Sequence, residues 1–307
     1  MKKIMFLISV CACANSFAGE GTTAANFLKV SMSAREAALA GAYSALADDS
    51  NAIFSNPAAL ASVEKSELSL GFTSYIQDSK MGLLSFAGDH KDAKFGVGFS
   101  ALSVTGIERR GLTDAAGVVG ETGDFGSSDM AVFLSYAKKD VLTDMIDDLD
   151  GGMTLKIVRS KIDDSSALAY AADLGVLYSY SEKIRISLAL FNLGTKMKYE
   201  DESDNLPLDL KAGLAYKYGE KTSLVVEVNE YIHDEKFYPS LGVEHFLRDG
   251  FALRAGYKFG YDTSNLGSLV GVTAGFGMKV SDMGFNYAYV PFGDLGNIHR
   301  FDFQMKF

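Results

Sequence analysis

Apolar and polar residues alternate along most of this chain, from about Glu67 to the carboxyl terminus. The last stretch, Phe301–Phe307, shows the pattern most clearly, with a large apolar side chain at every second position. A period of two predicts a β-strand with one apolar face and one polar face. Runs of this kind, rich in Val, Ile, Tyr and Phe, centre on residues 67–76, 81–89, 94–104, 129–137, 152–162, 168–180, 183–193, 207–218, 222–231, 236–246, 250–259, 268–280, 283–292 and 298–307.

These fourteen runs predict an all-β fold, a transmembrane antiparallel β-barrel over residues 66–307. An even count returns the chain to the side of the membrane that it left, as in single-chain bacterial barrels. A final strand closed by phenylalanine, here Phe307, is typical of bacterial outer-membrane barrels, and we expect it to be the signal for the barrel-assembly machinery. The apolar faces would meet outer-membrane lipid and lipopolysaccharide, and the polar faces a lumen.

The connections between the runs differ in length in a regular way. If the first strand starts in the periplasm, tight periplasmic turns lie at 90–92, 181–183, 219–221, 248–250 and 281–282, and the long loops 105–127, 194–206 and 260–267 lie outside, which is the usual asymmetry. The connection 140–152 breaks this rule, because it is periplasmic but long. Apolar residues at helical spacing predict a short amphipathic helix there, namely Val141, Leu142, Met145, Ile146 and Leu149. Its aspartates favour a solvated acidic face over a calcium site, because the full calcium loop is missing.

The parity of each strand predicts which side chains face the lumen. The expected lipid-facing sets are Leu208/Leu210/Leu214/Tyr216, Phe251/Leu253/Tyr257/Phe259 and Phe285/Tyr287/Tyr289. The expected lumen-facing charges are Lys156, Asp173, Arg185, Asp209, Lys211, Glu227, Glu244, Arg254, Lys258, Arg300 and Asp302. Acids and bases are nearly balanced in this set, which favours a salt-bridged interior over a charge-selective pore.

The region before the strands divides into two parts. Residues 1–18 form a predicted secretory signal peptide, with Lys2-Lys3, an apolar core and a cleavage site ending at Ala18. A lipoprotein signal with Cys13 as the lipidated residue is the rival interpretation. Residues 19–65 do not alternate, and Ser33 followed by Glu36 is a capping box that predicts a short helix. Because a strand-poor segment cannot lie in lipid, we expect it in the lumen or in the periplasm.

Composition narrows the function classes. Both cysteines lie in the predicted signal peptide, so the mature chain would cross an oxidising periplasm without disulfides to form. Removing Lys2 and Lys3 from the 29 basic residues leaves 27 against 39 acidic ones, a formal net charge of −12, which argues against nucleic-acid binding. None of the four histidines has a partner at metal-ligand spacing, and no nucleophile elbow or phosphate loop is present. We therefore predict neither an enzyme nor a cofactor.

The N-terminal region resembles the PorV/PorQ family of outer-membrane proteins in the order and spacing of four segments: Gly21–Lys29, Ser33–Tyr43, Ala45–Asp49 and Asn56–Ala61. The Ala-Asp-Asp turn and the Asn-Pro-Ala step are also similar to the FadL-like fatty-acid transporters. The resemblance implies a fourteen-stranded barrel of a Gram-negative-type outer membrane with residues 19–65 as a plug inside the lumen. The plug motif would comprise Arg35, Gly41, Asp48, Asp49, Asn56 and Pro57.

Two hypotheses of function remain. The first is a plug-gated passive transporter of hydrophobic small molecules. The second is a non-enzymatic component of a type IX-like secretion or assembly system that binds cargo or protein partners at its extracellular loops. The lumen charges weaken the first hypothesis, because a fatty-acid conduit needs an apolar pocket. The apolar residues of the N-terminal region would either line such a pocket or form the core of the plug: Phe27, Leu28, Ile53, Phe54 and Leu60.

Overall fold

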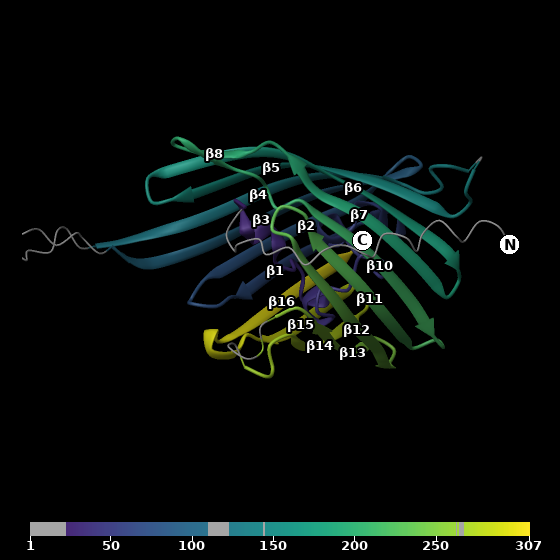
Figure 1. Ribbon diagram of the computed structural model, residues 1–307. Helices are drawn as coiled ribbons and strands as arrows, with labels where there is room; N and C mark the ends of the chain where they lie inside the picture. Colours follow the sequence, from purple (N-terminus) through teal and green to yellow (C-terminus); the bar gives the residue numbers. More distant parts are fainter. Residues whose placement is uncertain (1–22, 110–122, 144, 262, 264–266) are drawn as a thin grey trace, which may run out of the picture.

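The chain forms a closed barrel in which every strand is antiparallel to both neighbours (Figure 1). The computed structural model describes residues 23–109, 123–143, 145–261, 263 and 267–307. The predicted signal peptide and the part of the predicted loop at 110–122 lie outside the described residues. The barrel strands are β1 (Glu67–Ser74), β2 (Lys80–His90), β3 (Ala93–Arg109), β4 (Gly123–Lys138), β5 (Leu149–Ile162), β6 (Ser165–Ser181), β7 (Ile184–Gly194), β10 (Asp209–Tyr218), β11 (Thr222–Tyr231), β12 (Lys236–Arg248), β13 (Phe251–Lys258), β14 (Val272–Val280), β15 (Met283–Pro291) and β16 (Asn297–Lys306).

Each strand pairs with the next one in this series, and β1 pairs with β16 to close the ring. The prediction of a fourteen-stranded antiparallel barrel is therefore confirmed. Because the pairing is antiparallel, the connections after β1, β3, β5, β7, β11, β13 and β15 share one end of the barrel, here called the loop end. The other end, here called the turn end, carries Glu67 and Phe307.

The remaining elements are short. A two-stranded hairpin of β8 (Met197–Tyr199) and β9 (Glu202–Asp204) lies within the predicted loop 194–206, and η3 (Gly293–Leu295) precedes β16. Residues 23–65, here called the N-terminal segment, contain η1 (Asn26–Lys29), α1 (Ala34–Ala38), α2 (Ala52–Ser55) and η2 (Pro57–Ser62). Figure 1 shows this segment, in purple, within the ring of strands.

Two expectations about the connections are wrong. The predicted loop 105–127 begins and ends as strand, because β3 and β4 stay paired out to Arg109 and Gly123, and Figure 1 shows this hairpin extending beyond the other strands. The predicted helix in 140–152 is absent from its described residues, which form turns before β5. Asp140 and Asp148 adopt positive φ angles of 52° and 60°, which a helix does not accept, and Val141 N–H donates to the carbonyl of Leu149 (2.9 Å).

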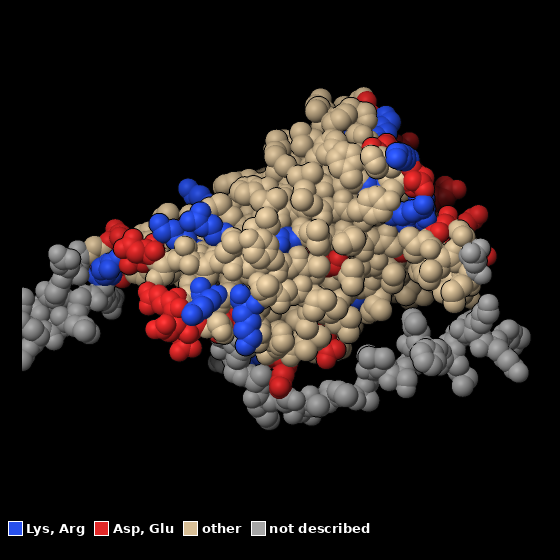
Figure 2. All heavy atoms as spheres, turned by 90° about the horizontal axis from the view of Figure 1, so that it is seen from above, with Lys and Arg blue, Asp and Glu red and all other residues tan. Residues whose placement is uncertain are grey.

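The exterior of the barrel is an apolar surface. Figure 2 shows Lys, Arg, Asp and Glu gathered towards the two ends, with a broad uncharged region between them. Large apolar side chains are exposed at alternate positions of the strands, as at Leu134, Leu155, Leu188, Leu214 and Leu253. Water would disfavour so large an apolar surface, whereas hydrocarbon would not, so the exterior fits a membrane.

Two residues at different depths on the same strand test whether the apolar exterior lies in a membrane. Leu214 lies near the middle of β10, and Tyr218 lies on the same face at the turn end. We expect Leu214→Arg to lower the free energy of unfolding in lipid by about 2–4 kcal/mol and Tyr218→Arg by about 0–1 kcal/mol. Reversible unfolding in denaturant measures both variants, and equal losses would contradict a membrane midplane at Leu214.

The seam between β1 and β16 depends on the last residue as well. Phe307 N–H donates to the carbonyl of Ser66 (2.9 Å), and the Phe307 ring stacks on Phe86 with centroids 6.1 Å apart.

Deleting Phe307 should lower the amount of assembled barrel, because both the seam contact and the expected assembly signal are lost. Heat-modifiable migration on gels measures the assembled fraction. Phe303→Leu, which keeps an apolar lipid-facing side chain in the same strand, is the control. Normal assembly without Phe307 would refute the expectation.

Candidate functional site

Carboxylates on the inner wall accept hydrogen bonds from the backbone of the N-terminal segment. Glu227 accepts from the N–H groups of Tyr43 (3.1 Å) and Ser44 (2.8 Å). Asp302 accepts from Ala34 N–H (2.6 Å), and Glu67 accepts from Ser50 N–H (3.0 Å). The three wall acids are all buried. Because these N–H groups have no strand partner, the wall acids satisfy what a sheet would otherwise satisfy.

The sequence explains why the segment turns where it does. The Ser33 hydroxyl accepts from Glu36 N–H (3.2 Å) and begins α1, as the capping box predicts. The Glu36 carboxylate accepts instead from Met32 N–H (2.9 Å), and burial raises its pKa. Gly41, with φ +90°, ends the turn that follows α1, and Gly41 N–H donates to the carbonyl of Glu36 (3.0 Å).

Arg35 joins the segment to the wall through side chains. Its guanidinium binds both oxygens of Glu244 (Nε to Oε2 2.9 Å, Nη2 to Oε1 2.8 Å), and it also pairs with Asp48 (2.5 Å) and Asp49 (3.4 Å). Glu244 binds Arg254 on the neighbouring strand as well (2.6 Å). Burial opposes the charge on Arg35, but Asp48 and Glu244 hold the pKa of its guanidinium well above the usual value. A bidentate, buried arrangement of this kind is the strong form of an ion pair.

The Asn56-Pro57 step lies against the wall at two glycines. The Asn56 amide donates to the carbonyls of Ser44 (3.2 Å) and Val176 (3.3 Å), and its oxygen accepts from Ala58 N–H (3.1 Å). A Cβ at Gly152 would lie 2.4 Å from the Pro57 carbonyl carbon, and a Cβ at Gly175 would lie 2.2 Å from Asn56 Oδ1. Only glycine at these inward positions lets the step approach the wall.

The other predicted lumen charges lie elsewhere. Arg185 donates to the Ala47 carbonyl (3.3 Å) and to the Ser62 hydroxyl (2.9 Å). Asp173 pairs with Lys156 (2.6 Å) and accepts from Asn192 N–H (2.8 Å), so it does not meet Arg35. Of the predicted residues, the structure thus brings together Arg35, Asp48, Asp49, Glu244 and Arg254, with Arg185 close to Asp48, and keeps Asp173, Asn56 and Pro57 apart from them.

The apolar residues of the segment form core. Phe27, Ile53, Phe54 and Leu60 are buried in one hydrophobic cluster, and Leu28 packs on its edge. Phe54 meets the inward ring of Phe133 edge to face, with centroids 4.9 Å apart. These side chains therefore fill the lumen rather than line a large apolar pocket.

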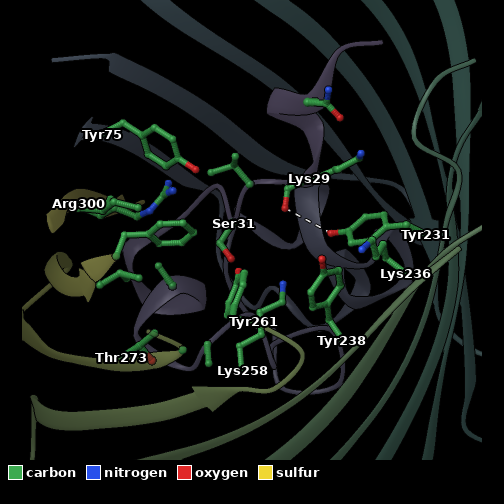
Figure 3. A pocket seen from close by; sticks show the side chains of 18 of the residues that line it. Lys29, Ser31, Tyr75, Tyr231, Lys236, Tyr238, Lys258, Tyr261, Thr273 and Arg300 are labelled. Atoms are coloured by element: carbon green, nitrogen blue, oxygen red, sulfur yellow. Dashed lines mark hydrogen bonds between the residues drawn. The ribbon is translucent and has the colours of Figure 1, made fainter. Parts of the chain in front are cut away.

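A cavity of about 350 Å³ lies at the loop end, between η1, α1 and the wall (Figure 3). We call it the mouth cavity. This volume lies in the range of small-molecule sites. Its lining includes Lys29, Ser31, Tyr75, Tyr231, Asp234, Lys236, Tyr238, Lys258, Tyr261, Phe292 and Arg300, with Val30, Ala37, Ala40, Val290 and Ile298 as apolar members.

One side of the mouth cavity is an aromatic wall. Successive ring centroids lie 5.9 Å apart from Tyr231 to Tyr238, 5.7 Å from Tyr238 to Tyr261, and 5.6 Å from Tyr261 to Phe292. Burial raises the pKa of Tyr75 and of Tyr261, so both phenols stay protonated and can donate hydrogen bonds. The cavity therefore combines flat apolar surfaces with polar donors.

Sequence reasoning named Lys258 and Arg300 as lumen charges but missed the tyrosines of the mouth cavity. The alternation could have placed two of them. Tyr231 lies an even number of positions from the lumen-facing Glu227 on β11, and Tyr238 from Glu244 on β12, so both face the lumen. In membrane barrels, tyrosines near strand ends commonly form the interfacial girdles, and this masks the signal. Tyr75 and Tyr261 lie just outside the strands, where alternation gives no direction.

The described part of the chain contains no group of three or more His, Cys, Asp or Glu side chains that could hold a metal ion. Among the same residues, no helix has the length and apolar character needed to cross a membrane.

Comparisons with known proteins show which solved structures share this fold. The model of an uncharacterised protein family, UPF0164, matches residues 5–137. The toluene transporter TodX of Pseudomonas putida is similar with a TM-score of 0.66 at 13% identity, over 89% of this chain and 96% of that one. The toluene transporter TbuX of Ralstonia pickettii gives 0.64 at 14%, over 90% and 98%. A FadL homologue of Pseudomonas aeruginosa gives 0.58 at 12%, also over 90% and 98%.

No curated protein sequence matches the chain. The chain thus has the fold of FadL-type fourteen-stranded barrels, and at these identities the likeness concerns the fold alone. The resemblance to PorV/PorQ proteins stays a prediction.

The Arg35 cluster gives a test of how the segment is held. Arg35→Met should lower the free energy of unfolding by about 3 kcal/mol, because removal of one partner leaves buried carboxylates short of a counter-charge. Lys65→Met is the matched control, because its pair with Asp282 is exposed (58% and 52%) and solvent screens it. Denaturant unfolding in lipid measures both, and a loss at Arg35 no larger than that at Lys65 would contradict the anchoring role.

Proposed function

We propose that this protein is a passive transporter of hydrophobic small molecules in a bacterial outer membrane, with the N-terminal segment as its plug. The mouth cavity carries the proposal. It is an aromatic-walled chamber at the loop end of a membrane barrel, and part of its lining comes from the N-terminal segment. A molecule that enters at the loop end would meet this chamber first.

Three further observations support the proposal. The fold is shared with proteins described as toluene transporters. The apolar exterior suits a membrane. The loop end would face outwards, because the end of the closing strand β16, with Phe307, lies at the turn end. The mouth cavity offers aromatic rings and hydrogen-bond donors that can bind a solute, and the proposal includes no catalytic step.

The test is uptake together with ion exclusion. Proteoliposomes holding the mature protein should take up toluene faster than protein-free liposomes and should show little ion conductance. We expect little ion flow through the intact protein, because the described core of the segment packs against inward side chains of the wall. Deleting residues 22–60 should raise single-channel conductance in planar bilayers.

Arg35→Met is the milder companion variant if the deletion fails to assemble, and it should raise the frequency of brief openings. Porin-like conductance by the intact protein would refute the plug. Toluene uptake no faster than in protein-free liposomes would refute the transport function.

The secretion hypothesis has one structural feature in its favour. The β3–β4 hairpin extends beyond the rest of the loop end, where protein partners would bind. Genome neighbourhood separates the two proposals, since a secretion component would lie beside secretion genes.

A further inference from the structure

We infer that the mouth cavity binds a compact aromatic carboxylate, a single ring that carries one anionic group. The inference deepens the proposed transport function and rests on it for passage, but binding can be measured by itself. Two features of the cavity select the two parts of such a ligand.

The anionic group is selected by basic side chains of the cavity, foremost Arg300 and Lys258, that have no carboxylate partner among the described residues. Among the described residues, neither Arg300 nor Lys258 forms an ion pair, whereas Lys29, in the same cavity, pairs with Asp234 (2.5 Å). Arg300 is 3% exposed, and within the described part of the chain its guanidinium donates to the Met32 carbonyl (3.3 Å) and the Thr73 hydroxyl (3.2 Å). A buried cation without a counter-charge is costly, so an anion would stabilise this arrangement.

The acids nearest these two cations have other partners. Asp209, which acts on Lys258 through its charge, accepts from the Asn229 amide (3.0 Å). Glu36 accepts from Met32 N–H and lies 3.9 Å from Lys211, and Asp302 accepts from Ala34 N–H. The described lining of the cavity holds four basic residues and one acid, Asp234. An incoming carboxylate would therefore supply charge that the cavity lacks.

The ring is selected by the aromatic wall. Figure 3 shows the Lys258 ammonium between Tyr261 and Tyr238, and it lies 5.3 Å from the centroid of the Tyr238 ring. A ligand ring stacked on this wall would place its carboxylate beside Lys258. Aromatic pairs of this kind add about 0.5–1.5 kcal/mol beyond the area they bury.

The size of the chamber favours a compact ligand. An apolar cavity of about 150 Å³ already holds benzene, so about 350 Å³ accommodates a substituted ring. A second cavity inside the barrel measures about 20 Å³, and its described lining shares no residue with that of the mouth cavity. A long alkyl chain would have to displace the segment or leave its tail in water.

Calorimetry on the full mature protein in detergent tests the inference with four soluble probes. Benzoate carries ring and charge, benzyl alcohol the ring alone, cyclohexanecarboxylate the charge alone, and decanoate the charge on a long chain. We expect benzoate to bind about tenfold more tightly than each of the others. If benzyl alcohol binds as tightly as benzoate or more tightly, the cavity does not select an anionic group. The same result for cyclohexanecarboxylate would overturn the selection of an aromatic ring, and for decanoate the selection of a compact ligand.

Variants then locate the site. Lys258→Met and Arg300→Met should each weaken benzoate binding about tenfold, and Lys217→Met, exposed at the turn end, should leave it unchanged. Heat-modifiable migration confirms that each variant is folded, and Lys258→Met decides the matter if Arg300→Met does not fold. Benzoate binding that survives Lys258→Met unchanged would refute the site.

The outcome separates this inference from the transport proposal. Proteoliposomes that take up toluene while the protein fails to bind benzoate would overturn the inference and leave the transporter standing. A protein that binds benzoate but speeds the uptake of neither compound would keep the binding site and refute transport.

Discussion

The hydrogen bonds between inward carboxylates and the N-terminal segment are the interaction on which the rest of this structure depends. A barrel wall satisfies its own backbone, but a segment inside it has N–H groups without a ladder. Glu227 and Asp302 take those of Tyr43, Ser44 and Ala34 directly. An acid in the wall is favourable here because it meets a donor, whereas an unpaired acid at the same depth would cost several kcal/mol.

This arrangement also explains why the mouth cavity is basic in a chain with a formal charge of −10. Three inward acids, Glu227, Asp302 and Glu244, are engaged by the segment at Tyr43, Ala34 and Arg35. The basic residues nearer the loop end, Lys258 and Arg300, then have no carboxylate to pair with among the described residues. A balanced count of lumen charges does not tell which of them form pairs, and only the three-dimensional arrangement reveals it.

Much of the fold could be predicted from the sequence, because a strand in a barrel wall repeats one local rule. Alternation specified the fourteen barrel strands, and Ser33 with Glu36 specified the start of α1. The same reasoning failed at 140–152, where apolar spacing suggested a helix but the aspartates at 140 and 148 adopt left-handed turns. Turn conformations depend on a few hydrogen bonds rather than on a repeating pattern, so periodicity does not report them. The partner of Arg35 was equally inaccessible, since Glu244 lies 209 positions away and parity gives only the direction of a side chain.

The charged lumen argued against a hydrophobic substrate when only the sequence was considered, and the structure weakens that argument. Arg35, Glu244 and Arg254 neutralise one another, and Lys156 neutralises Asp173, so most lumen charges hold the segment or the wall together. Paired charges contribute little field to a passing solute, because the opposite charges lie within a few ångströms of each other. In the proposed transporter, a solute would meet the aromatic wall of the mouth cavity and the two basic side chains beside it. A lumen rich in charge can therefore still present a mainly apolar site, and the polarity that a solute meets is set by the few charges that remain without a partner.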